Sequence, residues 1–184
     1  MKKNICITGL LSGYSEHIAE LLAKDLDVFF ADVLKMVQFD IVDVSNTIEL
    51  CGVDYYKELI SKKLRELSKF DDVIIFCQYY YLQYSTCKKM FRKNLITVYL
   101  DLDEQDFNKK IQKEKLTQLE AKLEKGAYKV RNKFFAKNCD IVIKCSQKDD
   151  IEVVELIKNA LLLYYSQPSY LVSLYSLSFR KIFN

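Results

Sequence analysis

The sequence predicts an α/β fold in which helices cover both faces of a parallel sheet. Short apolar runs alternate with amphipathic helical patterns along most of the chain. Residues 73–77 are apolar throughout, as expected for a central parallel strand that is buried on both faces. The apolar repeat within residues 53–69 is typical of a helix that packs on such a sheet. Because strands and helices alternate, the strands are expected to run parallel in a three-layer arrangement.

Each strand is expected where an apolar run occurs, and each helix where apolar residues recur at helical spacing. The expected strands cover residues 5–7, 28–31, 73–77, 95–100 and 140–144. The expected helices cover residues 15–25, 33–37, 53–69, 88–92, a segment after Asp101, the stripe Leu116, Leu119 and Leu123 up to a break at Gly126, then 128–137 and 151–165. Residues 39–51 are expected to be irregular, with a turn at residues 45–47. One domain is expected over residues 1–166, followed by an apolar tail over residues 167–184.

Composition favours an ordered globular protein, with 50% hydrophobic and 29% charged residues. The net charge of +3 is too small to indicate a nucleic-acid partner. No apolar run approaches the ~20 residues that span a bilayer, so no membrane association is expected. The six cysteines form no C-x-x-C pair and His17 is the only histidine, so no metal site is expected. Without a signal peptide, a reducing cytoplasm is the expected location.

The first strand-to-helix turn lies where proteins of this architecture carry a phosphate-binding loop. It reads Gly9, Leu10, Leu11, Ser12, Gly13, Tyr14, Ser15 and Glu16. This turn and the segments after it, over residues 3–165, resemble the shikimate kinases, a family of P-loop kinases. The family motif G-x-x-G-x-G-K-[ST] aligns with residues 9–16 without a gap, and the helical pattern that follows it aligns with Ile18, Leu22, Ala23 and Leu26.

The alignment replaces most of the residues that bind phosphate in the family. Gly9 is retained, whereas Ser12 and Tyr14 stand for glycines, Ser15 for the phosphate-binding lysine and Glu16 for the magnesium-binding hydroxyl. That lysine neutralises the phosphates and that hydroxyl holds Mg²⁺. Two unit charges ~4 Å apart interact by about 4 kcal/mol at an effective dielectric constant of about 20, so Glu16 would repel phosphate. In one interpretation the loop is a turn with Ser12 or Ser15 as helix cap; in the other it is a working nucleotide site.

The resemblance also implies candidate residues outside the loop. Asp32 retains the first aspartate of the family's D-x-D pattern, near magnesium, and is the catalytic candidate. Lys57 stands for an arginine that binds the substrate carboxylate, without the bidentate fork of arginine. Gln78 and Tyr79 follow the central strand, where the family has glycines that touch the substrate. Arg131 aligns with a second arginine for the substrate carboxylate, with a surface helix charge as the alternative.

The lid of the family offers an arginine to the phosphates, and Lys113 and Lys115 are the candidates here. Two functions remain open. The chain has either lost ATP-dependent phosphoryl transfer, needs no cofactor and binds a small anionic ligand or a protein partner, or it is an active small-molecule kinase that uses ATP and magnesium with a non-standard loop. A P-loop nucleotide kinase with a drifted motif is a third interpretation. The tail at residues 167–184 either packs on its own domain or forms a homodimer contact.

Overall fold

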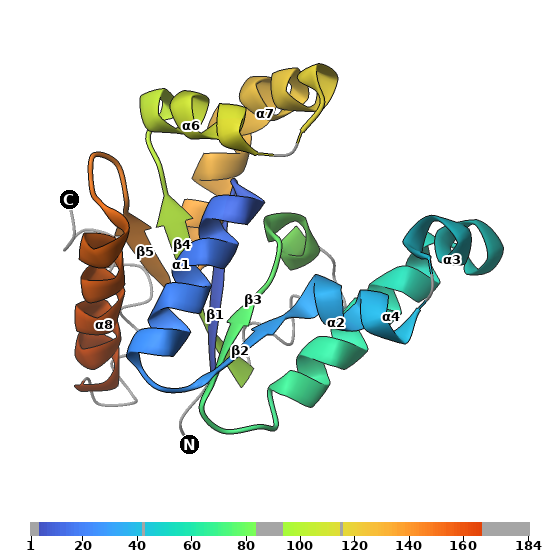
Figure 1. The fold of residues 1–184 in the computed structure, drawn as a ribbon, viewed down its shortest axis with the longest axis horizontal. Helices are drawn as coiled ribbons and strands as arrows, with labels where there is room; N and C mark the ends of the chain where they lie inside the picture. The colour runs from blue at the N-terminus through green and yellow to red at the C-terminus, as the bar shows by residue number, and fades with distance from the viewer. Residues whose placement is uncertain (1–3, 42, 84–93, 115, 167–184) are drawn as a thin grey trace. The chain divides into compact units, whose positions relative to one another are not determined.

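The computed structural model describes residues 4–41, 43–83, 94–114 and 116–166 (Figure 1). Its strands are β1 (Asn4–Gly9), β2 (Phe29–Asp32), β3 (Val73–Phe76), β4 (Leu95–Asp101) and β5 (Ile141–Lys144). Its helices are α1 (Ser12–Asp25), α2 (Val33–Asp40), α3 (Val44–Cys51), α4 (Val53–Leu67), η1 (Tyr79–Gln83), α6 (Glu104–Lys110), η2 (Ile111–Lys113), α7 (Gln118–Asn138) and α8 (Asp150–Ser166). The strands form a sheet of order β2-β3-β1-β4-β5. The predicted α/β fold with parallel strands is therefore confirmed.

Two parts of the prediction, the helix at residues 88–92 and the apolar tail at residues 167–184, lie outside the described residues. Among the helices that are described, none combines the length and the apolar character that crossing a membrane requires. The chain divides into two compact units. The first unit comprises residues 1–8 and 19–97, and the second comprises residues 9–18 and 98–184.

The first unit is built on the parallel strands β2, β3 and β1. Ile74 of β3 lies opposite Phe30 on one side and Ile5 on the other, and all four residues of β3 are buried. Helix α4 supplies Tyr56, Ile60 and Leu64 to the core, because residues four apart lie on the same face of a helix. The buried cluster of this unit comprises Cys6, Ala31, Val33, Val37, Tyr56, Ile60, Leu64, Leu67, Val73, Ile75, Cys77, Tyr81 and Leu95.

The second unit begins within β4 and contains residues 98–101 of this strand, which pair in parallel with β5; Tyr99 lies opposite Val142. Every residue of β4 is buried. Helix α7 packs through aromatic side chains: the ring centroids of Phe135 and Tyr99 are 5.9 Å apart, and those of Tyr128 and Phe107 are 4.8 Å apart. Such ring pairs add to the free energy gained by burial.

The prediction that residues 39–51 are irregular is wrong, because residues 44–51 form helix α3. Asp43 caps this helix, and its carboxylate accepts a hydrogen bond from the Asn46 amide at 3.0 Å. The predicted turn at residues 45–47 is the first turn of α3. No residue of α3 is fully buried, and the apolar residues that it packs against the core, Val44 and Ile48, are only partly buried, so its apolar pattern is short and weak.

The predicted break at Gly126 is also wrong, because α7 runs without interruption from Gln118 to Asn138. A glycine inside a helix costs about 1 kcal/mol relative to alanine. The helix tolerates this cost with a capping box at its start, where the Thr117 hydroxyl accepts from the Glu120 amide and the Glu120 carboxylate accepts from the Thr117 amide.

Candidate functional site

The segment aligned with a phosphate loop is a tight connection in which β1 ends at Gly9 and α1 begins at Ser12. The helix therefore starts three residues earlier than the predicted start at Ser15. Gly9 has no room for a side chain, since a Cβ there would collide with Ser15 Oγ and lie 3.3 Å from the Leu100 carbonyl oxygen. Close packing against β4 is thus sufficient reason for glycine at this position.

Ser15, which aligns with the phosphate-binding lysine, is fully buried. Its hydroxyl donates a hydrogen bond to the Leu11 carbonyl at 2.7 Å, and its amide donates to the same oxygen at 3.0 Å. The hydroxyl is a donor here, whereas a helix cap would accept a hydrogen bond. Ser12 and Glu16 are half-buried in the first turns of α1. The position of the lysine is therefore held by a small side chain whose hydrogen bond is made within the helix.

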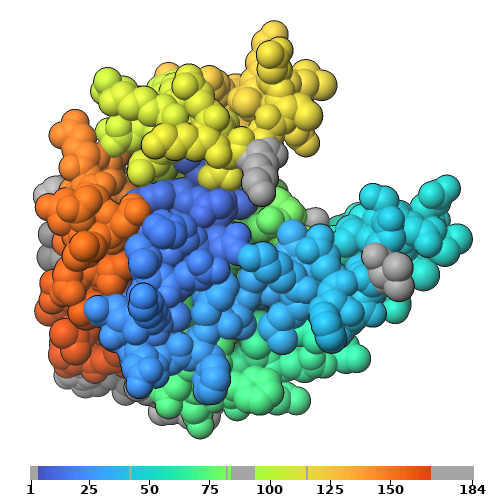
Figure 2. All heavy atoms as spheres, viewed as in Figure 1, coloured from blue at the N-terminus to red at the C-terminus, as the bar shows by residue number. Residues whose placement is uncertain are grey.

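The amides at the start of α1 are bound by the side chain of Glu114. Its Oε2 accepts a hydrogen bond from the Gly13 amide at 3.0 Å, and its Oε1 accepts one from the Tyr14 amide at 3.1 Å. The first amides of a helix have no partner within the helix, and they attract anions. Glu114 directly follows η2, and in Figure 2 the yellow segment that contains η2 lies against the dark blue start of α1. A carboxylate of the protein thus occupies the helix start where the sequence comparison predicts phosphate binding.

Glu114 was not predicted as a site residue. The sequence offers a weak signal for it, since it stands between the lid candidates Lys113 and Lys115. Lys113 is exposed at the end of η2, and Lys115 lies outside the described residues. Lys110 does contact the loop, since its Nζ lies 4.2 Å from the centroid of the Tyr14 ring. Burial raises the pKa of Tyr14, so its hydroxyl stays protonated.

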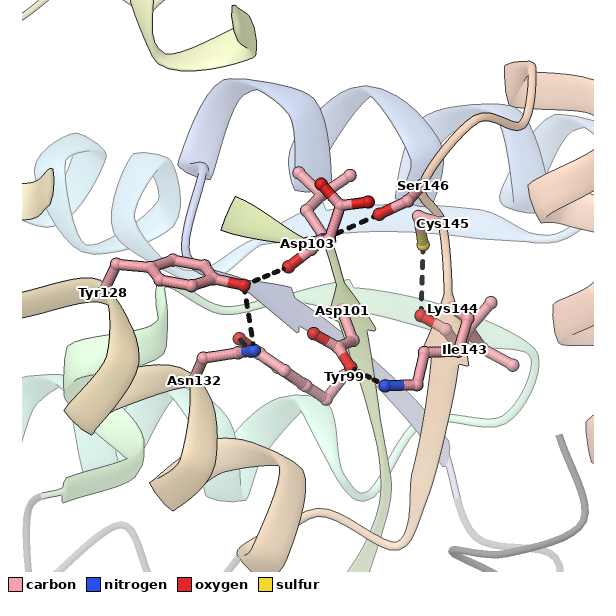
Figure 3. A network of polar contacts seen from close by, with 10 residues as sticks. Tyr99, Asp101, Asp103, Tyr128, Asn132, Ile143, Lys144, Cys145 and Ser146 are labelled. Atoms are coloured by element: carbon pink, nitrogen blue, oxygen red, sulfur yellow. Dashed lines mark hydrogen bonds and ion pairs between the residues drawn. The ribbon is translucent and has the colours of Figure 1, made fainter. Parts of the chain in front are cut away.

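A network of polar contacts lies at the carboxyl ends of β4 and β5 (Figure 3). Asp101 is 4% exposed, and its carboxylate is 2.6 Å from the Lys144 ammonium. The Cys145 thiol donates to the Ile143 carbonyl at 3.2 Å. Burial raises the pKa of Cys145 to about 12. The thiolate is the reactive form of cysteine, so this side chain is a poor nucleophile at neutral pH.

The same network continues through helix α7 (Figure 3). Tyr99 donates to the Asn132 amide oxygen at 2.6 Å, the Asn132 amide donates to the Tyr128 hydroxyl at 3.2 Å, and Tyr128 donates to the Leu102 carbonyl at 2.6 Å. Burial raises the pKa of Tyr128 to about 12. Each of these side chains has a protein partner, as buried polar groups require. The network therefore joins α7 to β4 and to Leu102, which follows it.

Asp32, the catalytic candidate, lies in the first unit at the end of β2 and is buried. Its Oδ1 accepts hydrogen bonds from the Leu34 amide at 2.8 Å and the Lys35 amide at 3.2 Å, which makes Asp32 the cap of α2. The Lys35 ammonium is 3.9 Å from its other oxygen. The structure thus gives this carboxylate a role in helix capping.

Replacing Asp32 by alanine is expected to lower the free energy of unfolding by about 1 kcal/mol, because the cap of α2 is lost. Replacement by asparagine, which caps helices equally well, should leave stability close to that of the wild type. Urea unfolding followed by circular dichroism measures both values. Equal losses for Asp32→Ala and Asp32→Asn would show that the negative charge, and not the cap, is what the fold needs.

The remaining candidates are held by local contacts. The Lys57 ammonium lies 2.8 Å from Asp54 on the same helix. Arg131, in the second unit, pairs with Glu124 within α7. Gln78 accepts a hydrogen bond from Tyr80. The structure thus pairs Lys57 and Arg131 with carboxylates of their own helices.

Tyr79 begins η1, shortly after the end of β3 at Phe76, and is buried. Its ring centroid is 5.5 Å from that of Tyr80. Next to it, the hydroxyls of Tyr81 and Tyr56 are 2.8 Å apart in the core. Aromatic rings therefore pack at the place where the resemblance predicts a substrate contact.

The model of the shikimate kinase family matches residues 16–162, so the match begins at the last residue of the loop. A search of curated proteins gave no match. Shikimate kinase from Aquifex aeolicus is similar in structure, with a TM-score of 0.68 and 25% identity over 90% of this chain and 99% of that one.

Two further solved structures share the fold. Shikimate kinase from Bacteroides thetaiotaomicron has a TM-score of 0.73 and 14% identity, over 87% of this chain and 98% of that one. Shikimate kinase from Acinetobacter baumannii, solved in complex with shikimate, has a TM-score of 0.72 and 14% identity, over 90% of this chain and 96% of that one. The family model covers most of the chain, and the chain therefore belongs to the shikimate kinase family.

Proposed function

We propose that this member of the family no longer transfers phosphate from ATP and acts by binding. The proposal depends on Ser15, which aligns with the phosphate-binding lysine of the family. Its side chain is fully buried and hydrogen-bonded to the Leu11 carbonyl. Phosphoryl transfer depends on positioning and on neutralising the charge of the phosphates. A buried hydroxyl that donates to the backbone supplies neither the charge nor the reach of a lysine.

Two carboxylates at the loop support the same proposal. Glu114 accepts hydrogen bonds from the Gly13 and Tyr14 amides, and Glu16 stands where the family has the hydroxyl that holds Mg²⁺. Negative charge at both places opposes the binding of a triphosphate. These residues do not fit the complex of ATP with magnesium. The proposed ligand is instead a small anion or a protein partner, bound without a cofactor.

A second candidate function is an active ATP-dependent small-molecule kinase, and one observation favours it. Lys110 reaches the loop from the end of α6 and places its ammonium over the Tyr14 ring. A lysine from another segment can supply charge to a phosphate if geometry allows, because the chemistry needs the charge and not a particular chain position. In this alternative, Lys110 stands in for the missing loop lysine.

Thermal unfolding in the presence of Mg-ATP, together with an assay of phosphate transfer to shikimate, tests the proposal. The wild type is expected to show no saturable stabilisation and no transfer. A ligand that binds only the folded state at 100 times its Kd would add about 2.7 kcal/mol of stability. Turnover that is lost in Lys110→Ala would establish the second candidate in place of the first.

A repaired loop provides the positive arm of this test. The double variant Ser15→Lys, Glu16→Ser is expected to bind Mg-ATP at least ten times more tightly than the wild type, or about 1.4 kcal/mol. The double variant Ser15→Met, Glu16→Ser controls for side-chain size, because methionine fills similar space without the charge. Equal affinity of the two variants for Mg-ATP would mean that the missing lysine charge is not what prevents binding.

A further inference from the structure

We infer that Glu114 is an internal anion that occupies the phosphate position of the loop and must leave before a phosphate-bearing ligand can bind there. The inference deepens the proposed function and rests on its claim that the chain binds a small anion without transferring phosphate; it adds that this anion binds at the loop. It assigns an autoinhibitory role to a side chain that lies outside the loop motif. The ligand class is an oxyanion whose oxygens can replace the two carboxylate oxygens of Glu114.

The geometry of the contact is that of a bound oxyanion. Each carboxylate oxygen of Glu114 accepts one hydrogen bond, Oε2 from the Gly13 amide at 3.0 Å and Oε1 from the Tyr14 amide at 3.1 Å. Hydrogen bonds from amides to a charged acceptor are stronger than those to a neutral one. The positive end of the α1 dipole favours negative charge at the same place. A carboxylate therefore satisfies this helix start in the way that a phosphate oxygen pair would.

The absence of a side chain at Gly13 is what lets this carboxylate approach the backbone so closely. A Cβ at this position would lie 3.0 Å from Oε2, 3.2 Å from Oε1 and 3.3 Å from Cδ of Glu114. The missing side chain thus leaves room for an anion close to the backbone, which is the usual reason for glycine in a phosphate loop. In this chain the room is filled by Glu114.

The backbone around Glu114 holds its side chain in reach of the loop. The Glu114 amide donates to the Ile111 carbonyl at 3.2 Å, and the Leu116 amide donates to the Glu114 carbonyl at 2.8 Å. The same segment carries Lys110, whose ammonium lies over the Tyr14 ring. A phosphate that displaces the Glu114 side chain would bind near the Lys110 ammonium. The attraction to this cation grows with the charge of the ligand, so a phosphate group is favoured over a singly charged carboxylate.

The expected consequence is a competition between Glu114 and the ligand. Apparent affinity falls in proportion to the fraction of molecules whose site is open. The wild type should therefore bind inorganic phosphate and pyrophosphate weakly, and removal of the carboxylate should strengthen binding. Glu114→Ala empties the position, whereas Glu114→Gln keeps the shape of the side chain and removes only its charge.

The test is a titration of wild type, Glu114→Ala and Glu114→Gln with inorganic phosphate and with pyrophosphate, followed through the amide NMR signals of Gly13 and Tyr14. We expect pyrophosphate to bind Glu114→Ala at least ten times more tightly than the wild type, with these two amides shifting most, and Glu114→Gln to lie between them. Glu152→Ala is the matched control, because Glu152 also accepts a hydrogen bond from a backbone amide in the second unit, that of Asp149 at 3.0 Å. It should behave as the wild type.

Equal affinity of wild type and both Glu114 variants would overturn the inference, as would a lack of binding in both variants or shifts confined to other amides. If Glu114→Ala does not fold, the comparison of Glu114→Gln with the wild type decides alone, and a gain below threefold overturns the inference. The proposed function fails separately, through phosphate transfer by the wild type. Phosphate binding to the Glu114 variants without turnover supports both.

Discussion

Replacement of Phe135 by alanine is expected to lower the free energy of unfolding by about 3–5 kcal/mol, the usual cost of truncating a buried aromatic side chain. Phe135 is fully buried, and its ring packs 5.9 Å from that of Tyr99 in β4. The cost has two parts, the lost transfer of the ring from water and the cavity that remains. Urea unfolding followed by circular dichroism gives the value.

Phe134 provides the matched control, because it is the same residue type on the same helix and is 37% exposed. Its truncation should cost about 1 kcal/mol, since much of its ring already contacts water. Comparable losses for Phe134→Ala and Phe135→Ala would contradict the packing of α7 on β4. Equal denaturant slopes for the two variants would show that the change lies in the stability of the native state.

Lys144→Ala is expected to be the second most damaging change, with a loss of about 2–3 kcal/mol. Removing one member of a fully buried ion pair costs about 3–5 kcal/mol, because the other charge is left buried without a partner. Asp101 is 4% exposed, but the Lys144 side chain is 54% exposed, which reduces the expected cost. Thermal and urea unfolding of the variant measure the loss.

The pair of Lys158 with Glu155 is a suitable control, because its distance of 2.6 Å equals that of Lys144 with Asp101 while its carboxylate is 54% exposed. Exposed pairs contribute about 0–1 kcal/mol, so Lys158→Ala should change stability little. Salt should weaken the Lys158 pair more than the Lys144 pair. A loss for Lys144→Ala no larger than that for Lys158→Ala would mean that Asp101 is stabilised chiefly by other groups.

The strands and the longer helices could be predicted because burial leaves a signal in composition. The apolar run at residues 73–77 matches β3 (Val73–Phe76), and the amphipathic repeat at residues 53–69 matches α4 (Val53–Leu67). Helix α3 left a weaker signal, because the residues that it packs against the core, Val44 and Ile48, are only partly buried. Apolar spacing thus indicates fully buried elements more clearly than a short helix at the edge of the core.

The candidate site was less predictable than the fold. A loop motif is local in sequence, so the replacements at Ser15 and Glu16 could be identified by alignment. The partner of the loop amides could not, because Glu114 is 101 residues from Gly13 and no pattern connects them. Asp32 shows the same limit, since the alignment suggests a metal site and says nothing of the hydrogen bonds that cap α2.

Glu114, about 100 residues later in the sequence, accepts the hydrogen bonds of the Gly13 and Tyr14 amides. Exchange of these two amide hydrogens with solvent therefore requires the Glu114 side chain to move. The amides of Gly13 and Tyr14 are covered by a side chain that follows η2. Amide hydrogens exchange when the structure that protects them opens locally. The hydrogen-exchange rates of the Gly13 and Tyr14 amides therefore measure how often the hydrogen bonds to Glu114 break.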